Sequence, residues 1–234
     1  MKKESKNNIS SEVLAVFLDG NATAQESKEI ITALSEDAEL RELMHISQSV
    51  DTELSLASQE CEFIPMTAMA ATCNEENYCC LECEKYILQK LSIEFDEERL
   101  LQNAIRNGWQ KEKGTALHNV GRHLENKGLI VTRQYNASIE DIATALKDDE
   151  SVIVAVDGGE LLGNKADEIV EDLLIGQIPD HTVVVLSLDE KSNTITLFDP
   201  NSSKAKDIYQ IEQFKDAWND SKNYIVTITS NSMK

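Results

Sequence analysis

Two apolar runs near the C-terminal end constrain the fold more than any other feature of this chain. The runs Thr182–Leu188 and Thr194–Phe198 are rich in β-branched residues and flank the polar segment Asp189–Asn193. Such runs around a short polar turn predict an antiparallel β-hairpin. Ser151–Val156 and Tyr224–Ile228 have the same β-branched composition. The last third of the chain is therefore expected to build a sheet.

The hairpin also predicts which polar residues meet at its open end. Folding the chain about Lys191 places residue 181 opposite residue 201. Asp199 then lies one diagonal step from His181 on the neighbouring strand, within reach of its side chain. A carboxylate that accepts a hydrogen bond from one imidazole nitrogen fixes the tautomer, and the other nitrogen can then face a reacting group. The sequence thus predicts a His–Asp pair at one end of the sheet.

Helical periodicity dominates the part of the chain that precedes these strands. Residues 79–91, 96–107 and 114–128 carry apolar residues at helical spacing, and Gly108 and Gly128 are end signals for the second and third helices. Shorter elements are expected as a strand at Ile130–Thr132, a helix at Ile139–Leu146 and a helix near Gln213–Trp218. Helices that come first and an antiparallel sheet that comes later indicate an α+β fold.

The N-terminal quarter has a different organisation. Residues 1–55 predict a small helical segment for docking or regulation, in which Thr23 and Glu26 have the spacing of a capping box. Periodicity fades over residues 56–76, which are expected to be a linker. The main domain is expected to span residues 77–230.

Charge and hydropathy exclude several classes of function. The formal net charge is −20, with 42 Asp and Glu against 22 Lys and Arg. A surface this acidic repels nucleic acid and anionic membranes, so neither is an expected partner. No segment approaches the roughly 18 apolar residues of a membrane span, and the N-terminus lacks the apolar middle region of a secretory signal. We therefore expect a cytoplasmic protein.

The cysteines are grouped as reactive or buried thiols would be, not as a disulfide framework. Of the 5 cysteines, Cys73, Cys79, Cys80 and Cys83 are crowded into a short segment. Cys80 and Cys83 have a spacing that zinc permits, but the chain has no second pair to complete a tetrahedral site. Gly158–Glu160 lacks the further glycines of a dinucleotide loop. We expect neither a metal nor a cofactor.

Cys79 has the best position for a nucleophile, because it begins a predicted helix. The unpaired N–H groups and the positive end of the helix dipole favour thiolate over thiol at that position. Cys80, about 100° further around the helix, is the alternative nucleophile. Cys83 lies one turn beyond Cys79 and is expected in the core.

Residues 79–228 resemble the bacteriocin-processing cysteine peptidases, the double-glycine leader peptidases of the papain clan. The shared features follow one another in the family's order. They are Cys79, Asn107-Gly108-Trp109 with Gly114-Thr115, Val154-Ala155-Val156-Asp157, His181-Thr182-Val183-Val184, Asp199-Pro200 and Phe214-Lys215-Asp216-Ala217-Trp218.

This resemblance implies a papain-like fold and a thiol hydrolase that cleaves an amide bond of a peptide or protein. It assigns Cys79 as the nucleophile, His181 as the general base and then acid, and Asp199 as the residue that orients His181. Family members usually carry a Gln about six residues before the Cys as an oxyanion-hole donor. Cys73 occupies that position here, so Asn74 is the candidate donor.

The absent Gln keeps a second interpretation open. In that interpretation the chain is a peptidase-fold binding module without turnover, and its N-terminal helices are the working surface. Residues 14–41 resemble the N-terminal helical segment of bacterial anti-sigma factors, through a Leu-Asp-Gly-Asn turn and a Glu-Asp-Ala-Glu-Leu-Arg run. This likeness implies a protein partner for the N-terminal helices.

Overall fold

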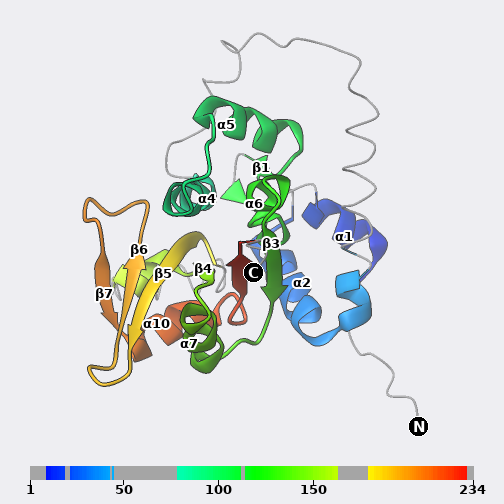
Figure 1. Ribbon diagram of the computed structural model, residues 1–234. Coiled ribbons are helices and arrows are strands. Elements are labelled where there is room, and N and C mark those ends of the chain that lie inside the picture. The colour runs from blue at the N-terminus through cyan, green and yellow to red at the C-terminus, as the bar shows by residue number, and fades with distance from the viewer. Residues whose placement is uncertain are drawn as a thin grey trace.

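An antiparallel sheet of 6 strands forms the centre of the protein, in the order β3-β8-β4-β5-β6-β7 (Figure 1). The computed structural model describes residues 9–18, 22–42, 44, 78–111, 114–162 and 179–230. The strands of the sheet are β3 (Ile130–Gln134), β4 (Ser151–Val156), β5 (His181–Asp189), β6 (Thr194–Phe198), β7 (Asp207–Gln210) and β8 (Ile225–Thr229). The predicted hairpin is confirmed as β5 and β6.

Strand β4 is buried along its whole length because both faces of the sheet are covered. Ile153 and Ala155 pack in one core, and Val152, Val154 and Val156 pack in the core on the opposite face. Successive side chains of a strand point to opposite faces, so a strand covered on both sides must be apolar throughout. This accounts for the unbroken β-branched run of the sequence.

Helix α4 (Cys79–Lys90) covers the first face of the sheet. Its buried residues include Leu81, Ile87 and Leu88, which lie on one face of the helix and pack in the same core as Ile153. Helix α5 (Glu97–Arg106) follows and is N-capped by Asp96, whose side chain accepts a hydrogen bond from the Arg99 N–H. Figure 1 shows both helices on the same side of the sheet.

The prediction of a third helix over residues 114–128 is wrong in extent, because the observed helix is much shorter. The segment begins instead with a small hairpin, β1 (Gln110–Lys111) and β2 (Gly114–Thr115), continues through the 3₁₀ turn η3 (Leu117–Asn119), and only then forms α6 (Arg122–Asn126). Gly121 has a φ of 91°, which right-handed helix cannot accommodate and which glycine adopts readily. A Cβ at Gly121 would lie 2.7 Å from the Val131 side chain, so this turn requires glycine for space as well.

Helices α7 (Ile139–Lys147), α8 (Gly158–Leu162) and α10 (Ile211–Asn219) cover the second face. Phe214 and Trp218 of α10 are the largest side chains in this core, and their rings stack 5.4 Å apart. The Trp218 indole N–H donates to the Tyr224 carbonyl at 2.8 Å, so burial leaves this donor satisfied. The predicted helices near residues 139–146 and 213–218 are confirmed.

The N-terminal helices α1 (Ser11–Leu18) and α2 (Ala24–Glu36) pack against the rest of the protein. Thr23 and Glu26 form the predicted capping box. Ile31 belongs to the core beneath α4, and the Asn136 amide donates to the Ser35 carbonyl at 3.0 Å. In Figure 1, α1 and α2 lie beside β3, away from β7.

Some expectations lie outside the described residues, and others missed an element. The predicted linker of residues 56–76 falls in the undescribed part of the chain. The edge strand β7 was not predicted, because Asp207–Gln210 has only one strongly apolar residue and that residue, Ile208, is 68 % exposed.

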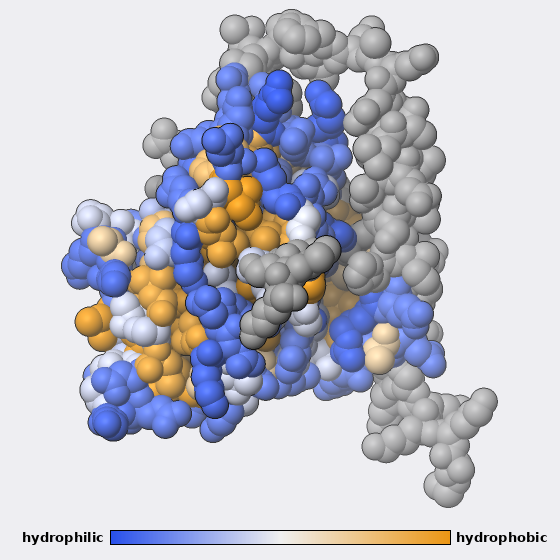
Figure 2. All heavy atoms as spheres, viewed as in Figure 1, coloured by the Kyte–Doolittle hydropathy of each residue, from blue (hydrophilic) through white to orange (hydrophobic). Residues whose placement is uncertain are grey.

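On the face shown in Figure 2, hydrophobic side chains gather over the sheet and hydrophilic ones cover the outer sides of the helices. No described helix is long and apolar enough to cross a membrane.

Candidate active site

The fold brings the start of α4 to the end of the sheet where β5 begins and β6 ends. Cys79 is the first residue of α4, His181 is the first residue of β5, and Asp199 directly follows β6. Val184 pairs with Phe198, and continuation of this register places residue 181 opposite residue 201, as the turn about Lys191 predicts. A register shift between Val185 and Ser187 lies further along the hairpin.

His181 and Asp199 form a buried hydrogen-bonded pair. The distance between His181 Nε2 and Asp199 Oδ1 is 2.7 Å, and the two residues are 8 % and 5 % exposed. The same carboxylate oxygen accepts a hydrogen bond from the Asn201 N–H at 2.8 Å. This second bond holds the carboxylate in place, because the loop after β6 turns back onto it.

Cys79 lies on the other side of the imidazole. It is hydrogen bonded to His181, and since Asp199 occupies Nε2, this bond is left to Nδ1. Burial, the largest influence, raises the pKa of the Cys79 thiol. The hydrogen bond and charge of His181, together with hydrogen bonds from Thr182, outweigh that effect and bring the pKa of Cys79 below its ordinary value.

The two partners of His181 stabilise its protonated form. Burial alone lowers the pKa of His181, but the hydrogen bonds and negative charges of Asp199 and Cys79 raise it to about 10. Burial raises the pKa of Asp199, but the hydrogen bonds from His181 and the Asn201 N–H have the larger effect. The net result is a pKa below the ordinary value. Between the pKa of Cys79 and the pKa of His181, the site therefore holds thiolate, imidazolium and carboxylate in a row.

The other described thiols have different surroundings. Cys80 is buried and its Sγ lies 3.6 Å from Glu84 Oε1. Cys83 is fully buried, as predicted, and its Sγ donates to the Thr182 carbonyl at 3.2 Å. Burial, with nearby negative charges, raises the pKa of both thiols well above the ordinary value. The geometry thus joins Cys79 to the imidazole and turns Cys80 toward a buried carboxylate.

Glu84 is a buried carboxylate that sequence reasoning missed. It is 2 % exposed and accepts hydrogen bonds from the Gly121 N–H at 2.7 Å and the His123 N–H at 3.1 Å. Burial raises its pKa to about 7, although these bonds lower it in part. A signal was present, because Glu84 lies three and four residues from apolar positions on the inner face of α4. Glu84 ties the helix that begins with Cys79 to the glycine turn before α6.

The remaining candidates do not add to the site. Cys73 and the proposed oxyanion donor Asn74 lie outside the described residues, so the assignment of Asn74 stays a prediction. His118 and His123 lie on η3 and α6, and neither is among the groups that act on His181. Within the described ranges, no three His, Cys, Asp or Glu side chains are grouped so that they could hold a metal ion.

Comparison with known proteins assigns the family. The model of the Peptidase_C39 like family matches residues 58–226, which is most of the chain and includes all three residues of the site. The chain belongs to the Peptidase_C39 like family. Its helices and antiparallel sheet have the α+β, papain-like fold that was predicted.

One solved structure that this Peptidase_C39 like protein resembles is distant in sequence. A crystal structure described as a candidate C39-like peptidase from Bacillus anthracis superposes with a TM-score of 0.48 at 14 % sequence identity. That match covers 67 % of this chain and 90 % of the other. No curated protein sequence matches. The likeness of residues 14–41 to anti-sigma segments lies outside the family match and stays a prediction.

Proposed function

We propose that the protein is a cysteine peptidase in which Cys79 attacks the carbonyl carbon of a peptide bond. His181 is the acid and base of this reaction, and Asp199 holds the His181 ring in position. The observation that carries the proposal is the hydrogen-bonded row Cys79–His181–Asp199 at the start of α4, with its 2.7 Å bond between imidazole and carboxylate. Family membership supports the same chemistry.

The reaction follows from the charges of the three groups. The Cys79 thiolate bonds to the carbonyl carbon, and the electron pair moves to the carbonyl oxygen. The first N–H groups of a helix have no partner within the helix, so the Cys79 N–H can donate to that oxyanion, and we assign Asn74 as the second donor. Collapse of this intermediate breaks the C–N bond, and the amine leaves with the proton of His181 Nδ1.

Hydrolysis of the acyl-enzyme restores the site. His181 is now neutral at Nδ1 and takes a proton from water as the water oxygen bonds to the acyl carbon. Collapse of the second intermediate breaks the C–S bond, releases the carboxylic acid product, which loses its proton to solvent, and returns thiolate and imidazolium. Asp199 stays ionised throughout, and its role is to hold Nε2–H and to stabilise the imidazolium.

Alkylation of single cysteines by iodoacetamide tests the proposal. Cys79 should react well below pH 8, because its thiolate is stabilised by His181. In His181→Ala the hydrogen bond and charge of His181 are lost, so burial is opposed only by the hydrogen bonds of Thr182 and the pKa of Cys79 should rise. At pH 6 we expect the alkylation rate of Cys79, followed by peptide mass spectrometry, to fall about 100-fold or more.

The matched control is His118→Ala, which removes another imidazole that does not act on Cys79. It should leave the pH dependence of Cys79 alkylation unchanged. Equal reactivity of Cys79 in the wild type and in His181→Ala would overturn the proposal. A binding module that has kept only the fold is the interpretation that such a result favours.

The Asp199→Asn variant should move the alkaline limb of the cleavage profile to lower pH. An Asn oxygen can still accept from His181 Nε2–H, but the negative charge that raises the pKa of His181 is gone. His181 is needed as an acid, so activity is lost as pH rises through its pKa, which is about 10 in the wild type. We expect a downward shift of one to three units, by the usual effect of a neighbouring opposite charge.

The shift is measured as the pH dependence of kcat/KM on a cleaved peptide. Asp189→Asn is the control, because Asp189 is an exposed residue at the far end of the same hairpin. An unchanged alkaline limb in Asp199→Asn would contradict the role given to Asp199.

A further inference from the structure

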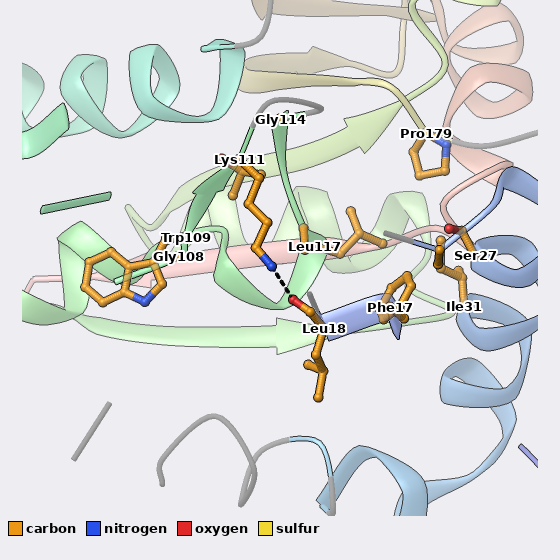
Figure 3. Close-up of a pocket in the computed structure, with 13 residues that line it drawn as sticks. Phe17, Leu18, Ser27, Ile31, Gly108, Trp109, Lys111, Gly114, Leu117 and Pro179 are labelled. Carbon is orange, nitrogen blue, oxygen red and sulfur yellow. Dashed lines mark hydrogen bonds between the residues drawn. The ribbon is translucent and has the colours of Figure 1, made fainter. Parts of the chain in front are cut away.

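A cavity of about 310 Å³ lies where the N-terminal helices meet the small hairpin of β1 and β2 (Figure 3). The helices contribute Phe17, Leu18 and Ile31 to its wall, and the rest of the protein contributes Trp109, Leu117 and Pro179. The wall is therefore built from two parts of the chain that are far apart in sequence. It is also largely apolar.

The contacts around the cavity hold α1 in place. Lys111 Nζ donates to the Leu18 carbonyl at 2.7 Å, which fastens the end of α1 to β1 (Figure 3). The Phe17 ring lies 6.2 Å from the His118 ring. Burial, with nearby positive charges, lowers the pKa of His118 to about 3, so this imidazole is neutral at physiological pH. The side of the cavity at Phe17 thus carries no charge from His118.

Two segments connect the wall of the cavity to neighbours of the candidate active-site residues. Pro179 lies two residues before His181 in the sequence. On the other side Thr115 forms a side-chain hydrogen bond with Cys80, the residue after Cys79. These links place the cavity beside the segments that carry Cys79 and His181, within reach of a substrate that extends from the thiolate at about 3.3 Å per residue.

We propose that this cavity binds a large apolar side chain of the substrate, one or two residues from the bond that is cleaved. The proposal rests on the peptidase function proposed above and adds its substrate class. The volume is at the lower end of the roughly 300 to 1,000 Å³ typical of ligand pockets, which suits one bulky side chain. Helices α1 and α2, which precede the family match, act as specificity elements.

The N-terminal helices are essential to this pocket because they supply one of its walls. Ile31 is 5 % exposed and also belongs to the core beneath α4, so α2 is packed against the peptidase part of the chain. Removal of Phe17 and Ile31 would open the cavity to water. An apolar side chain that enters it would then bury less surface and gain less binding free energy.

Peptide chloromethyl ketones test the pocket directly. We would use acetyl-Xaa-glycyl chloromethyl ketones in which Xaa is Leu, Phe, Gly or Asp. The Cys79 thiolate forms a C–S bond and displaces chloride, and mass spectrometry measures the labelling rate at Cys79. The wild type should react about 10- to 100-fold faster with the Leu and Phe labels than with the Gly label, and slowest with Asp.

Two variants place the preference in the cavity. Ser27→Phe, on α2, puts a ring into the cavity and should reduce the ratio of the Leu rate to the Gly rate to near 1. Phe17→Ala opens the wall and should lower the same ratio. The ratio is measured within one variant, so a general change in thiolate reactivity cancels. Glu36→Phe, at the exposed end of α2, is the control and should keep the wild-type ratio.

The possible results separate the two proposals. A thiol at Cys79 that is unreactive to iodoacetamide would overturn the peptidase function, and the pocket proposal with it. Iodoacetamide reactivity with equal rates for all four labels would overturn the pocket alone. A Leu preference that survives unchanged in both Ser27→Phe and Phe17→Ala would also overturn it, because the side chain would then bind elsewhere.

Discussion

Cys79→Ala is expected to lower kcat/KM for peptide cleavage by four orders of magnitude or more, whereas Cys80→Ala should retain most of the activity. Loss of a catalytic nucleophile leaves only binding and oxyanion stabilisation, and comparable losses in serine peptidases reach about 10⁶-fold. Cys79 is bonded to His181 and its pKa is lowered, but Cys80 faces Glu84 and its pKa is raised. Substitutions of these two adjacent cysteines should therefore have very different effects on peptide cleavage.

A mixture of peptides from a digested proteome provides the substrate, and new termini are identified by mass spectrometry. Wild type, Cys79→Ala and Cys80→Ala are compared at equal concentration. Circular dichroism checks that each variant retains its fold. Loss of cleavage in Cys80→Ala with retention in Cys79→Ala would reverse the assignment and make Cys80 the nucleophile.

Glu84→Ala should destabilise the protein by about 3 kcal/mol, and the matched variant Glu82→Ala by much less. Glu84 is the buried acceptor for the N–H groups of Gly121 and His123, and Ala would leave both donors without a partner. Glu82 lies on the same helix, but its side chain is 43 % exposed in an ion pair with Lys85. Thermal unfolding should show a decrease in Tm of about 6 to 12 °C for Glu84→Ala.

Glu84 should also make the stability of the wild type depend on pH. Burial raises its pKa to about 7 in the folded protein, against about 4.3 in the unfolded chain. The folded state therefore binds the Glu84 proton more tightly than the unfolded chain does. The contribution of this proton to the free energy of unfolding is complete below pH 4 and is lost as pH rises to 7.

In Glu84→Gln, which cannot titrate, this part of the pH dependence should vanish. Denaturant unfolding of both proteins between pH 4 and pH 8 gives the difference in the free energy of unfolding. Parallel curves for the wild type and Glu84→Gln would contradict a raised pKa.

Local patterns in the sequence predicted the hairpin and the residues at its open end. The runs that become β5 and β6 are apolar and β-branched, and the turn between them is polar, so their register could be counted from the sequence. The start of α4 at Cys79 was also predicted, because apolar residues at helical spacing follow it. His181 and Asp199 were therefore placed together before any long-range contact was known.

Features that depend on long-range packing could not be predicted in this way. The predicted third helix begins only after Gly121, where the turn approaches Val131 and the Gly121 N–H donates to the Glu84 carboxylate, 37 residues earlier in the chain. A carboxylate on an apolar helix face has no local pattern that gives its partners. The packing of Phe17 and Ile31 beside Trp109 and Pro179 depends in the same way on distant segments.

The three groups of the site differ greatly in how far apart they lie in the chain. His181 and Asp199 are 18 residues apart and belong to one hairpin, a unit of a kind that forms within microseconds. Cys79 reaches them only when α4 docks on β5, an interface in which the Cys83–Thr182 hydrogen bond spans 99 residues. Partial unfolding that lifts α4 from the sheet would leave the His–Asp pair intact and return the thiol to its unactivated form. The influences that lower the pKa of the Cys79 thiol thus act only while α4 is docked on β5.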